Sequence, residues 1–580
     1  MQKRKLTALA AMVAAVALVA GCSGPGIENG SDGGEGDQPV NGRVIGDLNT
    51  VNSFEYDNLE DGEVTFAIEK TISNWNTLSA AGDLSETVWV TMPIYPSVFV
   101  LEPDGSTIKM NEDLLESAEM IQDSPTVIEY KIRQEAVWSD GVPITADDFV
   151  FHWKALNTRD CSECITHDSD GLDKVVSVEG SDNGKTVTVT YGESFAEWKR
   201  PFNRLLPAHL VEQNGGILES FNGYFADTVP TFSGGPYIIT DFQKDVSVTL
   251  EPNPKWWGQS PHLKKVVFRM ITDTQQTPIA MQNREIQASY PQPQVDLLKQ
   301  VEEMAPLGVR HQMNQTLVME SFLVNVSNSF LSDKPLRQAL AMVVNSQEII
   351  DKSVGQFDPT VEPLGNAMIM QQQAGYEDHS KELGFGQGDV DGAIALLENA
   401  GYEIKNEKLH TPDGAEVAPL RTVYSVGNAV RETTAEIFAA AAKKIGVTLR
   451  LETTDSLGST TAEQSPYGYD IVVVGYTGSP FLGSNAFKRY TTGTGYNQHY
   501  SNAEVDRLVD EALASTSDDK VIELINKADK LVLDDVYIIP IYQKPSLFMY
   551  YNEYGNMRDN PTVSGPTYNI LDWGIIAPAG

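Results

Sequence analysis

The sequence predicts an α/β fold divided into more than one lobe. Segments with the composition of strands are interleaved with segments whose apolar residues recur every three or four positions, as on one face of a helix. The length of 580 residues is enough for roughly three to four average domains. The composition, 41% hydrophobic and 21% charged, is that of a soluble globular protein and is too polar for a multi-span transporter.

The individual elements follow from local patterns. Strands are expected at 64–68, 127–133, 186–190, 246–250, 447–451, 471–474 and 537–542. Helical spacing of apolar residues is found at 336–343, 390–397 and 505–512. Gly401 follows the second of these helices, at a position where helices commonly end on a left-handed residue. Strands and helices mixed in this way predict a layered α/β architecture.

The charge and the cysteine content exclude several classes of function. Asp and Glu number 80 against 42 Lys and Arg, so the formal net charge is −38. Such a surface repels phosphate backbones, and we expect no binding of nucleic acid. Three cysteines are too few for a disulfide-dense scaffold or a multi-cysteine metal centre. We expect neither a bound metal nor a cofactor.

The N-terminus has the pattern of an export signal. Basic residues at 3–5 precede an uncharged, Ala-, Val- and Leu-rich stretch over 6–20, which is short for a helix that spans a bilayer. The stretch closes with Val19-Ala20-Gly21-Cys22, which is similar to a bacterial lipobox, where the cysteine is lipidated and cleavage precedes it. We therefore expect a signal peptide over 1–21 and a lipid on Cys22; a plain secretory signal with a chance cysteine is the alternative.

A flexible tether is expected to follow the lipid. Residues 22–60 form this segment, and 23–43 in particular are rich in Gly, Ser, Asp and Glu and cannot bury enough apolar surface to fold. Several acyl chains on one cysteine anchor a protein firmly. The expected location is therefore extracytoplasmic, at the cell membrane, with the lipid anchor as the only membrane contact. Because thiols oxidise outside the cytoplasm, Cys161 and Cys164 predict a local disulfide, with a redox-active pair as the alternative.

The segment from Ala136 to Leu156 carries the most specific pattern. Trp138-Ser139-Asp140-Gly141-Val142-Pro143 predicts a tight turn, because Asp-Gly favours a reversal and Pro143 cannot return to a strand ladder. Thr145, with Asp148 three residues later, is a variant of the capping box that begins a helix. The segment is therefore predicted to form the end of a strand, a turn and the start of a helix.

This segment resembles the hallmark region of the family-5 extracellular solute-binding proteins, the peptide, dipeptide and nickel receptors of ABC importers. Further segments follow in the order of that family: 233–237 with 250–257, 335–340, 393–402, 500–508 and 538–542. The match is imperfect at Ser233, Trp256 and Leu336, which stand where the family has Gly, Tyr and Val. The resemblance covers residues from about 64 to about 545.

The resemblance implies a two-lobed periplasmic-binding-protein-like α/β fold (class II, cluster C) with an extra subdomain. Lobe I is expected from 61–94, 206–271 and 538–580, the extra subdomain from 95–205, and lobe II from 272–537. The ligand lies between the lobes, which close on a hinge. The implied function is that of a monomeric, membrane-anchored receptor. It captures short peptides, passes them to an ABC permease and its ATPase, and catalyses no reaction.

The resemblance also implies which residues hold the ligand. Peptide receptors of this family bind an extended peptide through backbone groups. Ser79-Ala80-Ala81-Gly82 matches the first-lobe stretch, and Gly475-Tyr476-Thr477-Gly478 matches the second, with Tyr476 where the family often has Trp. Many members have an Asp for the ligand's ammonium group where this chain has Ser479. Either another acid takes that role or the ligand lacks the ammonium group; two ordinary surface loops are the alternative.

Other ligands and functions stay open at this point. Ligand identity varies on this fold, so a nickel chelate, haem or a sugar is an alternative solute. A secreted hydrolase is a more distant alternative, because the chain contains neither a G-x-S-x-G nor an H-E-x-x-H motif.

Two further motifs are interpreted as structural. Gly180 to Thr186 is similar to a phosphate-binding loop but has three residues between its glycines where four are required, so Asn183-Gly184 predicts a hairpin turn. The group His167, Asp168, Asp170 and Asp173 fails the calcium-loop pattern because Leu172 stands where an oxygen ligand belongs, and it predicts a solvated acidic loop.

Overall fold

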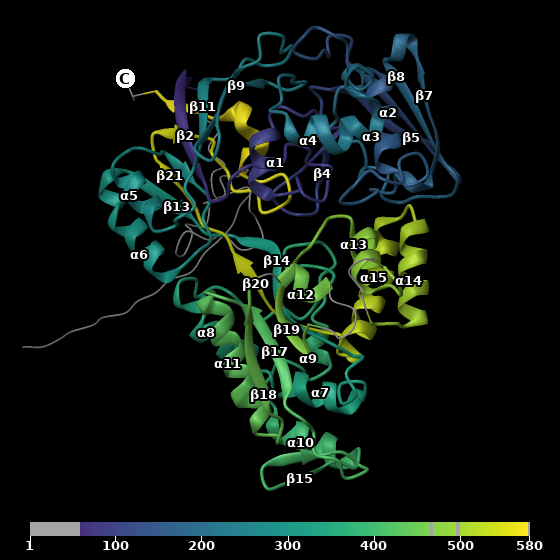
Figure 1. Ribbon diagram of the computed structural model, residues 1–580, viewed down its shortest axis with the longest axis vertical. Helices are drawn as coiled ribbons and strands as arrows, with labels where there is room; N and C mark the ends of the chain where they lie inside the picture. Colours follow the sequence, from purple (N-terminus) through teal and green to yellow (C-terminus); the bar gives the residue numbers. More distant parts are fainter. Residues whose placement is uncertain (1–57, 456, 463–467, 495–498, 578–580) are drawn as a thin grey trace, which may run out of the picture. The chain divides into compact units, whose positions relative to one another are not determined.

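The computed structural model describes residues 58–455, 457–462, 468–494 and 499–577 (Figure 1). The expected signal peptide over 1–21, the lipidation site Cys22 and the tether up to residue 57 lie outside the described residues. The end of the expected tether is ordered, because Leu59–Glu60 form strand β1, which pairs with β23 (Gly574–Ile576). Across the described ranges, no helix combines the length and the apolar composition that crossing a membrane requires.

Lobe I is built on a seven-stranded sheet. Its strands, in spatial order, are β13 (Val309–Gln312), β21 (Phe548–Tyr551), β12 (Ala288–Ser289), β2 (Gly62–Ile68), β11 (Leu263–Met270), β10 (Ser247–Pro252) and β9 (Tyr237–Gln243). β2 runs parallel to both neighbours, β11 and β12, so the segments that follow β2 and β12 lie at the same edge of the sheet. The core of this lobe centres on Phe66, whose ring contacts those of Phe268, Phe548 and Trp573.

Lobe II is built on a five-stranded sheet. In spatial order its strands are β18 (Leu449–Thr454), β17 (Leu420–Ser425), β19 (Ile471–Thr477), β14 (Gln315–Val324) and β20 (Ile538–Pro545). β17 is parallel to both β18 and β19, whereas β14 is antiparallel to β19 and β20. The ring of Phe322 on β14 packs against that of Phe438, with centroids 4.4 Å apart, in the core between sheet and helix.

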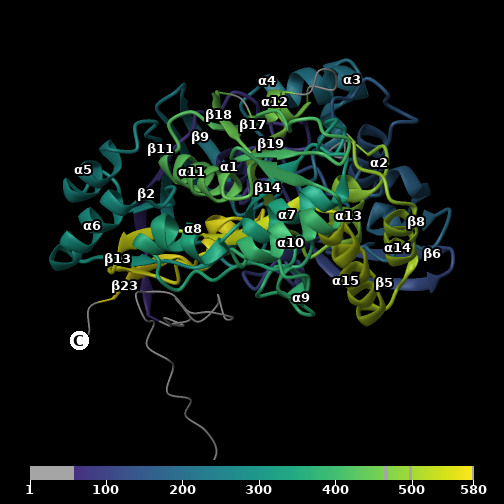
Figure 2. The same cartoon turned by 90° about the horizontal axis from the view of Figure 1, so that it is seen from below.

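Helices surround the two sheets. Those between β11 and β13 are α5 (Gln276–Gln282) and α6 (Val295–Glu303). Those of lobe II are α7 (Lys334–Val343), α8 (Ser346–Lys352), α9 (His379–Glu382), α10 (Val390–Asn399), α11 (Ala429–Lys443), α12 (Leu457–Ala462), α13 (Leu482–Tyr490), α14 (Ala503–Ala514) and α15 (Asp518–Asp534). The helices α13, α14 and α15 contact one another and lie side by side (Figure 2).

A third sheet forms the extra subdomain. Its strands are β5 (Leu115–Asp123), β6 (Thr126–Ile132), β8 (Thr186–Tyr191) and β7 (Val175–Ser181), and α2 (Ala146–Leu156) packs against β7 and β8. The remaining short elements are α1 (Ser85–Thr91), β3 (Phe99–Leu101), β4 (Ile108–Met110), α3 (Ile217–Glu219), α4 (Phe225–Asp227), β15 (Glu403–Lys405), β16 (Lys408–His410) and β22 (Tyr554–Gly555).

The local patterns read from the sequence are found in the structure. The turn before α2 is closed by the Gly141 N–H, which donates to Trp138 O at 2.8 Å, and Gly141 has a φ of 89°. Thr145 and Asp148 form the reciprocal capping box that begins α2. Asn183 and Gly184, both with positive φ, join the antiparallel strands β7 and β8, so this motif is a hairpin turn and not a phosphate-binding loop.

The boundaries between the lobes differ from the expected ones. Residues 272–312 were expected in lobe II, yet they carry β12 and β13, which pair within the sheet of lobe I. The segment 538–545 was expected in lobe I, yet as β20 it pairs with β14 of lobe II. Which sheet a strand joins depends on pairing partners far away in the sequence, and the apolar pattern of the strand does not reveal them.

The chain passes between the two sheets beside a buried acid. The two passages lie at 313–314 and 546–547, where Ser546 donates its N–H to Asn314 O at 2.8 Å. Asp559, which is 1% exposed, accepts hydrogen bonds from the side chains of both residues, at 2.8 Å from Asn314 and 2.5 Å from Ser546. One carboxyl group therefore holds together the two segments that connect the sheets of the lobes.

Candidate ligand-binding site

The predicted second-lobe stretch continues strand β19. Gly475, Tyr476 and Thr477 lie opposite Glu320, Met319 and Val318 of β14. On the other side of β19, pairing with β17 is confined to Ile471 and Val472 among the described residues. The stretch 475–477 therefore has β14 as its strand partner along one edge and lies beyond the residues of β19 that pair with β17.

The predicted first-lobe stretch is a turn that packs on the extra subdomain. The Ala80 N–H donates to Ile165 O at 3.1 Å, and the Gly82 N–H donates to Ser79 Oγ at 3.1 Å. A side chain at Gly82 would bring a Cβ within 2.1 Å of Asn76 O, so only glycine fits this turn. Three of the four backbone donors of this stretch, those of Ser79, Ala80 and Gly82, are thus occupied within lobe I, although Ala80 and Ala81 are exposed.

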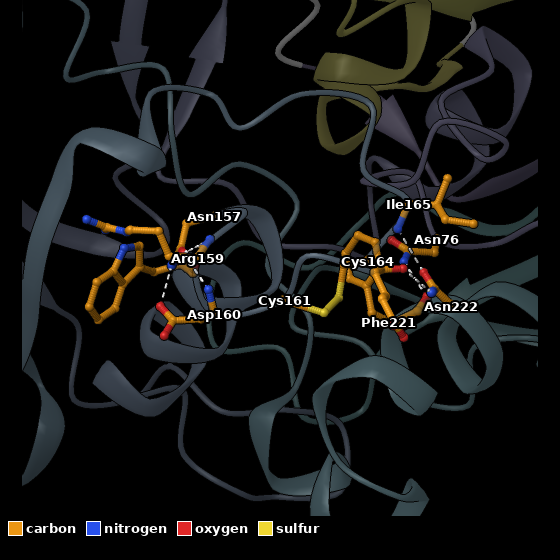
Figure 3. The surroundings of a disulfide bond; sticks show 11 residues. Asn76, Asn157, Arg159, Asp160, Cys161, Cys164, Ile165, Phe221 and Asn222 are labelled. Carbon is orange, nitrogen blue, oxygen red and sulfur yellow. Dashed lines mark hydrogen bonds between the residues drawn. A yellow bond between two sulfur atoms is a disulfide. The ribbon is translucent and has the colours of Figure 1, made fainter.

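A disulfide shapes the segment that holds this turn. Cys161 and Cys164 are bonded to each other immediately before Ile165 (Figure 3). The Ile165 N–H donates to Asn222 Oδ1 at 3.0 Å, and the Asn222 amide donates in turn to Glu163 O at 2.8 Å. The carbonyl of Ile165 is then in place to accept the hydrogen bond from Ala80.

A cavity of about 560 Å³ lies where the carboxyl ends of strands from both lobes meet. Its volume is within the range of small-molecule sites. Lobe I contributes 292–296, which follow β12 and begin α6. Lobe II contributes Glu320, the segment 352–357, the β17–α11 junction at 425–430 with Thr433, and Tyr542, Lys544 and Pro545 of β20.

A buried charged cluster lies beside this cavity, which two of its members, Glu320 and Lys544, line. The Glu320 side chain is 0% exposed and accepts a hydrogen bond from Arg431 Nε at 2.7 Å, while Lys544 Nζ lies 3.1 Å from its other oxygen. Burial acts to raise the pKa of Glu320, but the two neighbouring cations outweigh burial and hold this pKa below its ordinary value. Gly475 and Tyr542 flank Glu320 on the adjacent strands, so the cluster adjoins the predicted second-lobe stretch.

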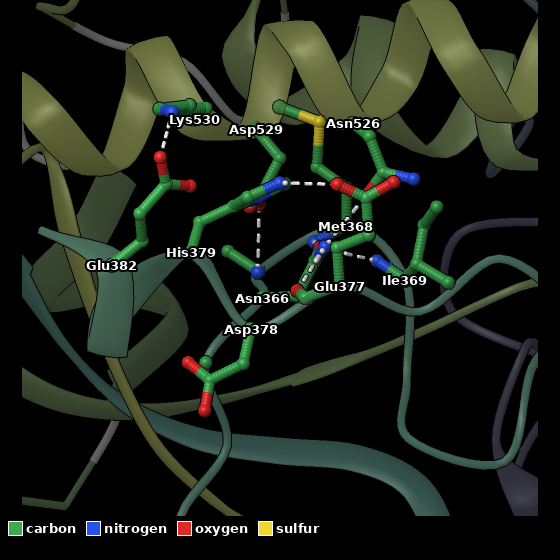
Figure 4. Close-up of polar contacts among 12 residues, drawn as sticks. Asn366, Met368, Ile369, Glu377, Asp378, His379, Glu382, Asn526, Asp529 and Lys530 are labelled. Carbon is green, nitrogen blue, oxygen red and sulfur yellow. Dashed lines mark hydrogen bonds and ion pairs between the residues drawn. The ribbon is translucent and has the colours of Figure 1, made fainter.

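Ser479 follows that stretch and is contacted by a segment held on α15. Gln373 Nε2 donates to Ser479 O at 3.1 Å and to Gly105 O of lobe I at 2.7 Å. The segment 366–379 is fixed to α15 by a polar network in which His379 Nδ1 lies 2.7 Å from Asp529 Oδ2 and the Ala367 N–H donates to the same carboxylate (Figure 4). Burial lowers the pKa of His379, but Asp529 outweighs it and raises the net pKa.

Further contacts join the extra subdomain to α13. Glu197, which is 8% exposed, accepts the Ser484 N–H at 3.0 Å and the Ser484 hydroxyl. Burial raises the pKa of Glu197. Lys488 of the same helix forms an ion pair with Asp168.

The acidic loop at 167–173 is not solvated as predicted. The side chains of Asp168 and Asp170 are 11% and 13% exposed, and both form ion pairs with Arg200. The prediction was wrong because Arg200 and Lys488 are far from the loop in sequence, so nothing nearby indicated their approach. Within the described ranges, no three His, Cys, Asp or Glu side chains are arranged to hold a metal ion.

The sequence analysis did not identify the cavity wall. Glu320 was detectable as a single acid within the apolar run of β14, a pattern that indicates a buried and paired charge. Arg431 and Lys544 carry no such signal, because each belongs to a different segment and reaches Glu320 through tertiary structure alone.

Known proteins share this architecture. The oligopeptide-binding protein OppA of Mycobacterium tuberculosis is 27% identical over 512 residues, which cover 87% of this chain and 83% of OppA. The solved structure of a periplasmic EDTA-binding protein, EppA, is 35% identical, with a TM-score of 0.87, and the match covers 92% of this chain and 100% of that one. The oligopeptide-binding protein AppA of Bacillus subtilis, solved with a nonapeptide, has the same fold, with a TM-score of 0.71 at 18% identity over 89% of this chain and 99% of that one.

The family match covers most of the chain. Residues 109–498 correspond to the family described as bacterial extracellular solute-binding proteins, family 5 Middle. This range contains the turn and helix around Trp138, the cluster around Glu320 and Arg431, and the stretch at 475–479. The chain belongs to the family-5 bacterial extracellular solute-binding proteins.

Proposed function

We propose that this protein captures short peptides between its two lobes and delivers them unaltered to an ABC permease. The observation that carries the proposal is the edge of β19 at 475–477, which lies beyond the pairing of β19 with β17. An extended peptide that pairs with such an edge gains backbone hydrogen bonds that do not depend on its sequence, while its side chains enter the adjoining space. Tyr476 provides an aromatic face beside this edge, with the Arg489 guanidinium 4.8 Å from its ring centre.

Family membership supplies the coarser part of this function. Proteins of this family are extracytoplasmic receptors that bind a small ligand for an ABC importer, and they are not enzymes. The relatives named for oligopeptide binding, OppA and AppA, favour a peptide over other solutes. The proposal also includes a monomeric state and a lipid anchor on Cys22, and replacement of Cys22 by Ala should release the protein from the membrane.

Closure of the lobes is part of the proposal. The contacts of Ser484 with Glu197, of Lys488 with Asp168, and of Gln373 with Gly105 all join segments of different lobes. Their formation would stabilise the closed, ligand-bound state, and the paired segments beside Asp559 would bend when the lobes open.

A polycarboxylate chelate is a second candidate ligand, and two observations favour it. Ser479 offers no charge for a ligand ammonium group, whereas a buried cluster with two cations lies close by. The EDTA-binding protein is also similar along most of its length.

The test is to identify the ligand directly. The receptor is purified from its native host without refolding, and its bound small molecules are released and measured by mass spectrometry. Short peptides in stoichiometric amount would support the proposal, and a different solute in that amount would overturn it. Calorimetry with a free peptide and its N-acetylated form then tests the role of Ser479. A loss of about a hundredfold on acetylation, some 2.7 kcal/mol, would mean that an acid elsewhere binds the ammonium group.

A further inference from the structure

A second, smaller cavity lies within lobe I, outside the candidate ligand-binding site. Its volume is about 150 Å³, and it shares no lining residue with the cavity between the lobes. At roughly 30 Å³ for each water molecule, this volume holds about five waters, so it is too small for a peptide and suits a compact group of about five non-hydrogen atoms. We call it the aromatic cavity, because four aromatic side chains line it: Tyr95, Trp256, Trp257 and Tyr568.

Closely packed prolines and glycines hold two of the walls in place. Pro93, Pro96 and Pro236 line the aromatic cavity together with Gly234 and Gly235. A Cβ at position 235 would lie 2.3 Å from Pro93 O, and a Cβ at position 234 would lie 2.7 Å from Pro96 Cγ. The two segments therefore pack against each other at a distance that only glycine allows, and the cavity is preformed.

Two adjacent tryptophans are fixed at the aromatic cavity by their indole N–H groups. Trp256 Nε1 donates to Gln259 O at 3.0 Å, and Trp257 Nε1 donates to Asp113 O at 2.6 Å. Because both N–H groups are satisfied within the protein, only the rings themselves are left to contact a ligand, and both side chains remain half-buried. Trp256 stands where the family has Tyr, and among aromatic side chains Trp attracts cations most strongly.

One acid accompanies these rings. Asp113 is the only charged residue among those that line the aromatic cavity. Burial raises the pKa of Asp113, and the attraction of Arg133 offsets this effect only in part. Within the described ranges, the Asp113 carboxylate forms neither an ion pair nor a hydrogen bond. Aromatic rings around a single carboxylate without a close counter-charge favour a cation over an anion or a neutral molecule.

We propose that the aromatic cavity binds a small quaternary ammonium ion. The rings attract the ion through their π systems, and the Asp113 carboxylate supplies the opposite charge. A trimethylammonium head group with its neighbouring methylene has five non-hydrogen atoms, which is the size that the cavity accepts. It also has no N–H to donate, in keeping with a wall made of rings. This inference does not rest on the proposed function, because the aromatic cavity lies outside the site between the lobes.

The experiment compares two probes of the same shape and different charge. One is choline, and the other is 3,3-dimethyl-1-butanol, in which a carbon atom replaces the nitrogen and removes the charge. Binding to the purified protein is measured at constant ionic strength by NMR titration of the methyl signal of each probe. The variants are Trp256→Leu, Trp256→Tyr and Asp113→Asn. The matched control is Trp198→Leu, which removes another half-buried indole that does not line the aromatic cavity.

We expect the wild type to bind choline about tenfold more tightly than the uncharged probe. Trp256→Leu and Asp113→Asn should each weaken choline binding by about fivefold or more. Trp256→Tyr keeps an aromatic ring, so its affinity should stay within about threefold of the wild type, and Trp198→Leu should not change it. Thermal unfolding of each variant confirms that it is folded.

Three outcomes would overturn the inference. The first is the absence of choline binding at millimolar concentrations. The second is equal affinity for the two probes, which would mean that the cavity binds apolar groups without regard to charge. The third is choline binding that a folded Trp256→Leu or Asp113→Asn variant leaves unchanged, which would place the ion elsewhere on this acidic protein. In each case the proposal of peptide capture between the lobes stands unaffected.

Discussion

Arg431 reaches Glu320 by passing over Gly475. Arg431 belongs to α11, which follows β17 in the chain, and Glu320 belongs to β14. In the sheet, β19 lies between β17 and β14. Arg431 Nε is 2.7 Å from Glu320 Oε1, and a Cβ at position 475 would lie 3.3 Å from Arg431 Nη2. Because Gly475 has no side chain, the guanidinium group of Arg431 can cross β19 and form an ion pair with the buried carboxylate of Glu320 on its far side.

Removal of Arg431 should destabilise lobe II. In Arg431→Met, the fully buried Glu320 keeps Lys544 as its only ion-pair partner among the described residues, and loss of one partner from a buried pair costs about 3 kcal/mol. Urea unfolding followed by circular dichroism measures this loss. The double variant Glu320→Gln with Arg431→Met should recover much of the lost free energy of unfolding. The control Arg507→Met breaks exposed ion pairs and should change stability by less than about 0.5 kcal/mol. A double variant as unstable as Arg431→Met would contradict this explanation.

Loss of the Ser484 hydroxyl should weaken ligand binding. In the closed state, Ser484→Ala leaves the buried Glu197 with one hydrogen bond fewer, which costs about 1–3 kcal/mol and lowers affinity by about five- to 150-fold. Calorimetry with the native ligand measures the change. Ser515→Ala, at a half-exposed position of the same lobe, is the control. Unchanged affinity in Ser484→Ala would show that this contact does not depend on closure.

His152 should make the protein less stable in acid. Burial lowers the pKa of His152 to about 3, and neither ring nitrogen has a partner among the described residues. Below the ordinary pKa of 6.5, the unfolded chain takes up a proton that the folded chain refuses, so stability falls by about 1.4 kcal/mol per pH unit down to about pH 3.

The variant His152→Phe removes this proton uptake. Between pH 7.5 and pH 5.0 the wild type should lose about 2 kcal/mol more than the variant. Urea unfolding at the two pH values gives the comparison, with His410→Phe as a control at a half-exposed position. Identical pH dependence in wild type and His152→Phe would refute the assignment.

The disulfide should protect the turn at 79–82 from opening. Joining residues only three apart in sequence, it is expected to stabilise the fold by about 2 kcal/mol. In the double variant Cys161→Ser with Cys164→Ser, the hydrogen bond from the Ala80 N–H to Ile165 O should open more often. Hydrogen exchange should then speed up at Ala80 and stay unchanged in β8. Equal exchange at Ala80 in both proteins would show that the disulfide does not hold this turn.

Local sequence patterns predicted much of the fold. The α2 capping box, the turn at Gly141 and the hairpin at Asn183-Gly184 depend on neighbouring residues, and all three are present. The assignment of β12, β13 and β20 to lobes failed, because pairing between strands distant in sequence decides it. The charged wall also went unpredicted, because Glu320, Arg431 and Lys544 meet only through tertiary structure.

The most direct test of the account is small-angle X-ray scattering before and after saturation with peptide, with saturation established by calorimetry on the same samples. If a small solute is gripped between two hinged lobes, the radius of gyration should fall on binding, and the peptide recovered afterwards should be intact. A saturated receptor whose dimensions equal those of the free protein would contradict the account.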